Sequence, residues 1–180
     1  MAWRRGRQVL KVERRSKLDT MESAGWLKQV IDRDRPEKVF LDVGGVGAGV
    51  YDRLTEMGYG RIVEAINFGG KPFEPPPVDG GGPLNRRAEM WMKSREWLED
   101  EAGVCIPDDD ALQADACGPS YRYDSNTRLL IEKKEDMRRR GVASPDGWDA
   151  VVLTFAEPVM VKIDRSRERY SGRATRWTTV

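Results

Sequence analysis

The sequence predicts an α/β fold in which helices flank a sheet with parallel strands, and two observations carry this prediction. Between residues 7 and 66, short apolar runs alternate with stretches of helical periodicity, in strand–helix–strand–helix–strand order. Such alternation is typical of parallel strands joined by helical crossovers. The chain has 180 residues, of which 39% are hydrophobic and 34% charged, a balance typical of a soluble globular domain.

The first half of the chain supplies three strands and two helices. We predict, in order, a strand at 7–13, a helix that Thr20 caps and Pro36 ends, a strand at 38–43, a glycine-rich turn at 44–49, a helix that closes at Gly58 and a strand at 61–66.

The second half begins with a proline- and glycine-rich loop at 68–83. We then predict helices at 85–101 and 108–116, a hairpin with strands at 121–123 and 128–131, a short helix at 134–140, and a last helix that starts at 144–146, runs through Phe155 and is ended by Pro158. Residues 1–160 form one predicted domain, and residues 161–180 form a basic C-terminal tail.

The composition excludes several kinds of chemistry. The chain has two cysteines and no histidine, so it can supply neither a Cys/His zinc cluster nor a Ser-His-Asp triad. Catalysis would have to use carboxylates, lysines, hydroxyls or a hard metal ion. No apolar run approaches the length of a membrane span and the basic start lacks a following apolar segment, so we expect a cytoplasmic protein without membrane contact.

Positive charge is clustered although the net charge is only +1. Basic residues gather at 4–17, 133–140 and 162–176. Such clusters suit a phosphate backbone, and a solvated charged face explains them equally well.

Asp42 is the first candidate functional residue, because it ends a predicted buried strand and glycines follow it directly. Ligands of open α/β sheets bind at the carboxyl ends of the strands. A dinucleotide-binding fingerprint fails, since it would need glycine in place of Val50, and no Gly-Lys-Ser/Thr of a P-loop follows. A helix-capping role for Asp42 remains open at this stage.

Asp146 and Asp149 are the second candidates. Their spacing places both carboxylates on one side of a helix, where they would suit Mg²⁺ or Mn²⁺ together with an acid from another element. The alternative is that Ser144 or Asp146 caps the helix. Lys133 and Lys134 lie upstream and suit contact with phosphate, or simply a solvated charged turn.

Four segments in order resemble the nuclease domain of phage terminase large subunits. They are Leu41-Asp42-Val43-Gly44-Gly45-Val46-Gly47 with Tyr51-Asp52-Arg53-Leu54, then Ile66-Asn67-Phe68-Gly69, then Asn85-Arg86-Arg87-Ala88-Glu89-Met90-Trp91, and finally residues 132–156. The resemblance spans about residues 6–160, and it rests on the order of the segments because no single one is specific.

The resemblance implies an RNase H-like mixed sheet flanked by helices and an endonuclease that cuts concatemeric viral DNA during packaging. In the family, three acids hold two divalent ions, Mg²⁺ or Mn²⁺. By position, Asp42 would be the second acid and Asp149 the third, with Asp146 as a further metal ligand. The implied DNA contacts are Lys133, Lys134, Arg138, Arg139 and Arg140. The implied partners are double-stranded DNA, the terminase ATPase domain, the portal and the small subunit, in the cytoplasm of a bacterium that carries the phage or prophage.

The chain departs from the family at its start. The family's first acid lies on a strand before the one at 7–13, and we find no counterpart of that strand; Asp19 follows the 7–13 strand and is in the wrong place to substitute. The ATPase motor is also absent. We therefore expect the downstream piece of a split or truncated gene, weak or inactive alone. The alternative function is an impaired DNA-binding or assembly fragment that needs another chain for the first acid and the motor; an unrelated nucleotide-binding domain is a third possibility.

Overall fold

The computed structural model describes residues 1–160 apart from residues 76, 78 and 79, so the predicted basic tail and the charge cluster at 162–176 lie outside the described residues. The strands are β1 (Ala2–Arg5), β2 (Gln8–Val12), β3 (Val39–Asp42), β4 (Val63–Ile66), β5 (Tyr121–Tyr123) and β6 (Leu129–Ile131). The helices are α1 (Thr20–Asp34), α2 (Gly47–Glu56), α3 (Arg86–Glu99), α4 (Asp110–Cys117), α5 (Lys134–Arg139) and α6 (Asp146–Leu153). Among the described residues, no helix is both long and apolar enough to cross a membrane.

The chain opens with an antiparallel hairpin of β1 and β2. The predicted strand at 7–13 is confirmed as β2, and a further strand that the sequence did not predict, β1, precedes it. Sequence reasoning missed β1 because its sequence, Ala-Trp-Arg-Arg, has no apolar alternation. Contacts of Arg4 stabilise the strand: its guanidinium lies 4.2 Å from the ring centroid of Phe155 and donates to the hydroxyl and carbonyl of Thr154. Nevertheless, β1 carries no carboxylate, so the strand before β2 supplies no acid.

Helix α1 begins one residue earlier than expected, because its cap is Asp19 and not Thr20. The Asp19 carboxylate accepts from the Glu22 amide at 2.8 Å, and the Glu22 side chain accepts from the Asp19 amide at 2.9 Å. This reciprocal pair satisfies two amides that a helix start leaves without partners. Arg35, with φ 47°, ends the helix just before Pro36.

The predicted parallel pairing of the next two strands is confirmed. Val39 of β3 donates to the carbonyl of Ile62 at 2.8 Å and Val43 donates to that of Ile66 at 2.9 Å. Asp42, the last residue of β3, lies opposite Ile66, the last of β4. The two strands therefore end at the same edge, and helix α2 begins within the glycine run that follows Asp42.

The helices and the hairpin of the second half appear in the predicted order. Asn85 caps α3 and Asp109 caps α4, each through its side chain. The last helix, α6, ends at Leu153, two residues before the predicted end, because Thr154 and Phe155 turn back with hydrogen bonds to Val151 and Val152.

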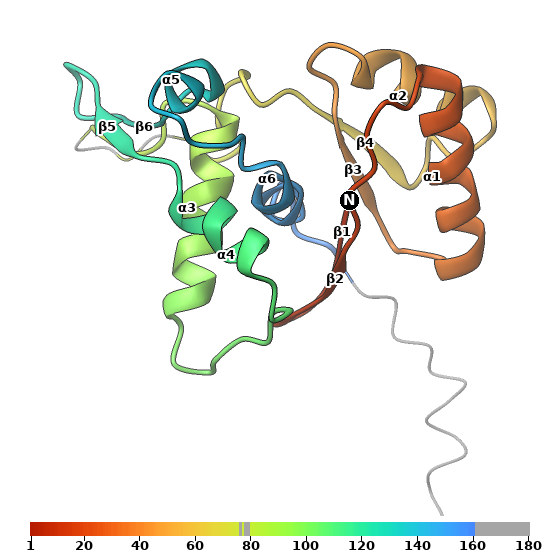
Figure 1. Ribbon diagram of the computed structural model, residues 1–180, viewed down its shortest axis with the longest axis horizontal. Coiled ribbons are helices and arrows are strands. Elements are labelled where there is room, and N and C mark those ends of the chain that lie inside the picture. Colours follow the sequence, from red (N-terminus) through yellow and green to blue (C-terminus); the bar gives the residue numbers. More distant parts are fainter. Residues whose placement is uncertain (76, 78–79, 161–180) are drawn as a thin grey trace, which may run out of the picture.

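Two apolar clusters lie on opposite sides of strands β1–β4. Helices α1 and α2 build one cluster around Leu27, Leu54 and Val63. Helices α3, α4 and α6 build the other around Met90, Trp148 and Val152. Figure 1 shows this arrangement, with α1 and α2 to one side of the strands and α6, α4 and α3 to the other.

The strands do not form the single mixed sheet that the sequence predicts. They form three two-stranded sheets: β1–β2, β3–β4 and β5–β6. Although both β1 and β3 pack against α6, no Cα atom of β1 comes within 8 Å of one of β3, and both strands are fully described. We call the space between β1 and β3 the seam. No described strand lies in it, and this is the physical reason that the expected sheet is divided.

Candidate active site

Helix α6 presents two acids at its start. Pro145 precedes the helix and makes no side-chain cap bond, so neither Ser144 nor Asp146 is the cap that the alternative interpretation required. Asp146 and Asp149 lie in the first turn, where negative charge complements the helix dipole. Trp148, Val151 and Val152 bury the opposite face in the core. That burial fixes the helix and so turns both carboxylates toward α3 and α5.

Asp149 is buried, with 5% of its surface exposed. Arg87 of α3 donates to both of its oxygens, at 3.1 Å and 3.3 Å, and the Trp91 indole donates at 2.9 Å. The Lys134 ammonium lies 3.1 Å from its second oxygen. Both oxygens of Asp149 are thus engaged by donors of this chain, so a metal ion at Asp149 would have to replace one of them.

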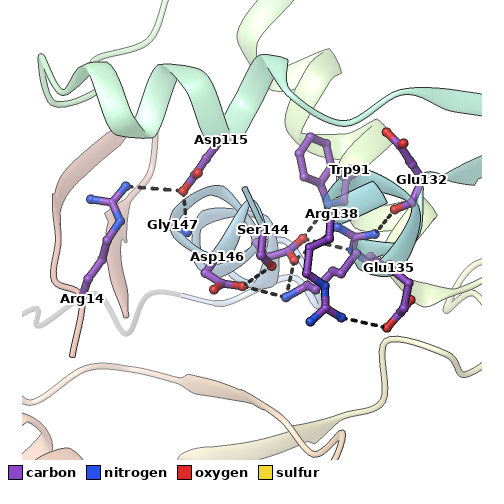
Figure 2. A network of polar contacts seen from close by, with 12 residues as sticks. Arg14, Trp91, Asp115, Glu132, Glu135, Arg138, Ser144, Asp146 and Gly147 are labelled. Carbon is purple, nitrogen blue, oxygen red and sulfur yellow. Dashed lines mark hydrogen bonds and ion pairs between the residues drawn. The ribbon is translucent and has the colours of Figure 1, made fainter. Parts of the chain in front are cut away.

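Lys134 bridges the two acids of α6. Its ammonium lies 2.8 Å from Asp146 Oδ1 and 3.1 Å from Asp149 Oδ2. Partial burial disfavours the charged amine, but the hydrogen bond to Asp146 and the charge of Asp149 outweigh burial and raise the pKa of Lys134. Figure 2 shows this network around the start of α6, with Asp146, Ser144 and Trp91 labelled. A cation therefore already sits between the two carboxylates.

Asp146 is the accessible acid of the pair, with 71% of its side chain exposed. Partial burial would raise its pKa, but hydrogen bonds from Lys134 and Ser144 lower it overall. Within the described part of the chain, these contacts both fall on Oδ1, from Lys134 at 2.8 Å and from Ser144 at 2.7 Å. Asp146 therefore keeps an oxygen for an external ligand, whereas Asp149 does not.

Asp42 ends β3 beside the glycine turn. Its Oδ1 accepts from the Gly44 amide at 3.1 Å, and no side-chain bond caps α2, so Asp42 is not a helix cap. A side chain at Gly47 would collide with the backbone carbonyl of Asp42, which explains why glycine stands there. Among the described residues, Asp42 makes no hydrogen bond or ion pair with Asp146 or Asp149, and no group of three acid, histidine or cysteine side chains could hold a metal ion.

A basic cavity of about 280 Å³ lies between the end of β4 and the start of α5. Its lining includes Arg87, Lys133 and Lys134 as well as Asn85, Glu135 and the turn at Phe68 and Gly69. Because Arg87 and Lys134 also hold Asp149, the cavity adjoins the acids of α6. Its size and charge fit a phosphate group better than an apolar ligand.

The other predicted DNA contacts differ in accessibility. Arg138 and Arg139 are 66% and 80% exposed, and their partners Glu135 and Asp136 lie one helical turn away on α5. Such surface pairs are weak and exchange readily. Arg140 instead pairs with Glu132 at 2.6 Å and donates to the Gly118 carbonyl, which makes it part of the scaffold around the hairpin.

Sequence reasoning missed Arg87 and Trp91 as partners of the acids. Both lie on α3, 62 and 58 residues before Asp149, and no local pattern relates such distant positions. A usable signal was present nonetheless: two arginines directly after the predicted helix start at Asn85 are unusual, because cations oppose the helix dipole there. Their burial needs acceptors, and Glu89 and Asp149 supply them.

No protein-family model matches the chain, and no curated protein matches it either. The fold, however, matches solved structures. The nuclease domain of the large terminase subunit gp2 of bacterial virus Sf6 is 20% identical over 87% of this chain and 81% of that chain, with a TM-score of 0.71. A mutant of that domain with manganese is 20% identical over 87% of this chain and 82% of that chain, with a TM-score of 0.72. The same mutant with manganese and beta-thujaplicinol is 17% identical over 87% of this chain and 81% of that chain, with a TM-score of 0.72.

These matches decide the fold. They span most of both chains, and they confirm the RNase H-like class that the four sequence segments predicted. The chain has the RNase H-like α/β fold of the nuclease domain of a phage large terminase subunit.

Proposed function

We propose that the chain is the metal-dependent endonuclease domain of a viral DNA-packaging terminase, encoded by a phage or prophage, that cuts concatemeric phage DNA in the host cytoplasm. The observation that carries the proposal is the pair of acids on α6 beside a basic cavity, within a fold that it shares with a terminase nuclease domain. The implied partners are double-stranded DNA, the terminase ATPase domain, the portal and the small subunit.

The donor chemistry of the site fits a hard divalent ion, Mg²⁺ or Mn²⁺. Asp42 and Asp146 offer carboxylate oxygens that the described contacts leave open, and hard cations prefer such ligands. Asp149 would join them if Arg87 or Lys134 moved away. A bound pair of ions would polarise the phosphate and activate water. In this proposal Asp42 and Asp146 would hold the ions through their open oxygens, and Asp149 would contribute only after losing one of its present partners.

The basic residues support a DNA substrate. Lys133 and Lys134 line the cavity, and Arg138 and Arg139 extend positive charge along the exposed face of α5. We propose that these four side chains contact backbone phosphates. Arg140 would act indirectly, because it holds Glu132 and, through that residue, the end of the hairpin.

A second function is favoured by the shortage of acids. The described residues contain no three-acid metal group, and two carboxylates bind a pair of ions weakly. A DNA-binding or assembly fragment that obtains its first acid and the ATPase motor from another chain would show this arrangement.

Metal binding tests the site and cleavage tests the function. We expect Mn²⁺ titration calorimetry of the full chain to show weak binding that Asp42→Asn and Asp146→Asn each reduce at least tenfold. The matched control is Asp110→Asn, which changes an exposed acid in the first turn of α4. Nicking of supercoiled plasmid in Mg²⁺ or Mn²⁺ should be slow, and both site variants should abolish it. Nicking without a divalent ion, or unchanged nicking in both variants, would contradict the proposal.

A further inference from the structure

The first turn of α6, which carries both candidate acids, receives its cap from another helix. A helix start leaves its first amides without backbone partners, and a nearby side chain usually accepts from one of them. Pro145, at the cap position of α6, makes no such bond. The Gly147 amide instead donates to Asp115 Oδ2 of α4 at 2.8 Å, across 32 positions of the chain. Asp115 therefore takes the place of the missing cap.

Asp115 is poorly placed for its own helix. It lies in the last turn of α4, where the helix dipole opposes negative charge. At the start of α6 the dipole favours the same charge. The side chain is only 15% exposed, so water solvates it poorly and its partners in the protein matter more. The carboxylate thus stabilises α6 at some cost to α4.

Arg14 holds Asp115 in this position. Its guanidinium nitrogens lie 3.4 Å from Asp115 Oδ2 and 3.1 Å from Oδ2 of Asp109, the residue that caps α4. Because Arg14 follows β2 in the chain, the contact links the N-terminal hairpin to α4 and, through Asp115, to α6. Figure 2 shows Asp115 between Arg14 and Gly147, beside the start of α6.

The close approach of Asp115 requires glycine at position 147. A Cβ atom there would collide with both the Arg14 guanidinium and the Asp115 carboxylate. Glycine within a helix normally lowers its stability, because it loses the most backbone freedom on folding. The residue between the two acids Asp146 and Asp149 is thus tied to the external cap by packing.

The external cap also leaves Ser144 free to contact Asp146. Serine near a helix start is a common cap. Here, however, Ser144 Oγ donates to Asp146 Oδ1 at 2.7 Å, and the Lys134 ammonium lies 2.8 Å from the same oxygen. These two contacts orient the more exposed acid of the pair. If Asp115 were removed, we expect Ser144 to turn toward the free Gly147 amide and Asp146 to lose one of them.

We propose that Asp115 is a positioning residue of the candidate active site: it caps α6 from outside and so holds Asp146 in the orientation in which it binds a divalent ion. It touches neither ion nor substrate and acts through the Gly147 backbone. The consequence for metal binding rests on the proposed function, whereas the orientation of Asp146 does not. Ligand groups must be held within about 0.5 Å of their working positions, which gives such a support its effect.

Two substitutions at one position separate the cap from the charge. Asp115→Ala removes the acceptor, so hydrogen exchange of the Gly147 amide should speed about fivefold, the equivalent of a lost cap. Without metal at neutral pH, the carbon signal of the Asp146 carboxyl should shift. Mn²⁺ titration calorimetry of the full chain should show affinity about tenfold weaker, the usual effect of losing a support behind a ligand.

Asp115→Asn is the rescue. The contacts with Gly147 and Arg14 both fall on Oδ2, so an amide nitrogen in the place of Oδ1 keeps the acceptor oxygen. Asparagine caps helices as well as aspartate, so all three readouts should return close to those of the unaltered chain. Should the alanine variant not fold, Asp115→Gln replaces it with the same expected losses, because its oxygen lies one methylene further out.

Asp109→Ala is the matched control for stability. It removes the cap of α4, with the bond from the Leu112 amide at 3.0 Å, and the other partner of Arg14. It leaves the contact between Asp115 and Gly147 in place. The melting temperature should fall about as far as in Asp115→Ala, whereas the Asp146 signal and the Mn²⁺ affinity should stay unchanged.

Two results would overturn the proposal. One is an unchanged Asp146 signal in Asp115→Ala, since the cap would then serve the helix alone. The other is an equal loss in Asp109→Ala, since Asp146 would then follow overall stability. Failure of the proposed function is distinguishable: Mn²⁺ would not bind the unaltered chain at all, while the Asp146 signal would still depend on Asp115.

Discussion

Asp149 carries its carboxylate into a site that is 5% exposed, and donors from α3 and α5 hold it there. Asp146, one helical turn earlier, is mostly exposed and has a single charged partner in the described structure. A buried carboxylate whose oxygens are all paired typically holds neighbouring elements of the fold together. An exposed carboxylate with an open oxygen typically binds a ligand. The two acids therefore differ in role although the sequence presents them as a pair.

This difference predicts unequal stability costs. Asp149→Asn should lower the free energy of unfolding by about 3 kcal/mol or more, because it leaves the buried Arg87 without its counter-charge. Asp146→Asn removes a largely exposed pair and should cost less than about 1 kcal/mol. Urea denaturation of both variants at neutral pH measures the contrast. Equal costs would show that the Arg87 pair does not anchor α6.

Glu132 predicts how stability changes in acid. A hydrogen bond from Arg140, helped by the Ser120 amide, lowers the pKa of Glu132 from its ordinary value of 4.5 to about 2. A folded-state pKa below the unfolded one means that the stabilisation is complete above about pH 4.5 and is lost as the pH falls toward 2. Glu132→Gln should therefore flatten the decline of stability over this range. Thermal melts from pH 6 to 2 measure it, and parallel curves for the two proteins would contradict the assignment.

At the scale of elements, the turn after β3 depends on one close approach. Gly47 begins α2 directly beneath the backbone carbonyl of Asp42, and a methyl group there would collide with it. The glycine thus allows the helix to start within a few residues of the acid. This contact requires glycine at position 47 for a packing reason that is independent of nucleotide binding.

Gly47→Ala should lower the unfolding free energy by about 1–3 kcal/mol, the usual cost of overpacking, and displace Asp42. Gly25→Ala is the matched control, since Gly25 lies within α1 with open space around it. That change should stabilise the protein by about 0.5–1 kcal/mol through helix propensity and the unfolded chain. Urea unfolding and the Asp42 amide chemical shift report both effects. A stabilising Gly47→Ala would show that the turn tolerates a side chain.

Local chemistry explains which elements were predictable. Strands β3 and β4 were predictable from two apolar runs with a helical segment between them. The β5–β6 hairpin was predictable from its Asp-Ser-Asn turn. The cap of α1 was misassigned because Asp19 and Thr20 are both good caps, and only the reciprocal bond with Glu22 decides between them. Strand β1 was missed because its stabilising contacts, Arg4 with Phe155 and Thr154, come from the other end of the domain.

At the scale of the whole molecule, hydrophobic periodicity could not reveal the seam, whereas the family resemblance, which leaves the strand before 7–13 without a counterpart, did predict an incomplete sheet. Whether two strands pair depends on what lies between them, and periodicity carries no information about an absent neighbour. The same applies to the site: the spacing of Asp146 and Asp149 was informative, but their partners Arg87 and Trp91 depend on how α3 crosses α6. The fold class was predictable because it rests on element order alone.

The divided sheet predicts two partly independent units. Residues 20–66 form a contiguous α–β–α–β unit around Leu54, and no ladder joins it to β1. Segments that share few hydrogen bonds open separately. In low urea, native-state hydrogen exchange should give Leu27, Leu54 and Val63 one opening free energy, and Met90, Leu112 and Val152 another. A single common value for all six would show that contacts through α6 suffice for one cooperative unit.

The contact between Arg4 and Thr154 also has a consequence for the order of events during synthesis. Its two residues are 150 positions apart, and Arg4 bonds both the hydroxyl and the carbonyl of Thr154. During translation the β1–β2 hairpin leaves the ribosome 150 residues before Thr154, so its anchor forms long after the hairpin itself is made. The unit at 20–66 can fold from local contacts long before that. We therefore expect β1 to be among the last of the described elements to reach its final position, because that position depends on residues near the end of α6.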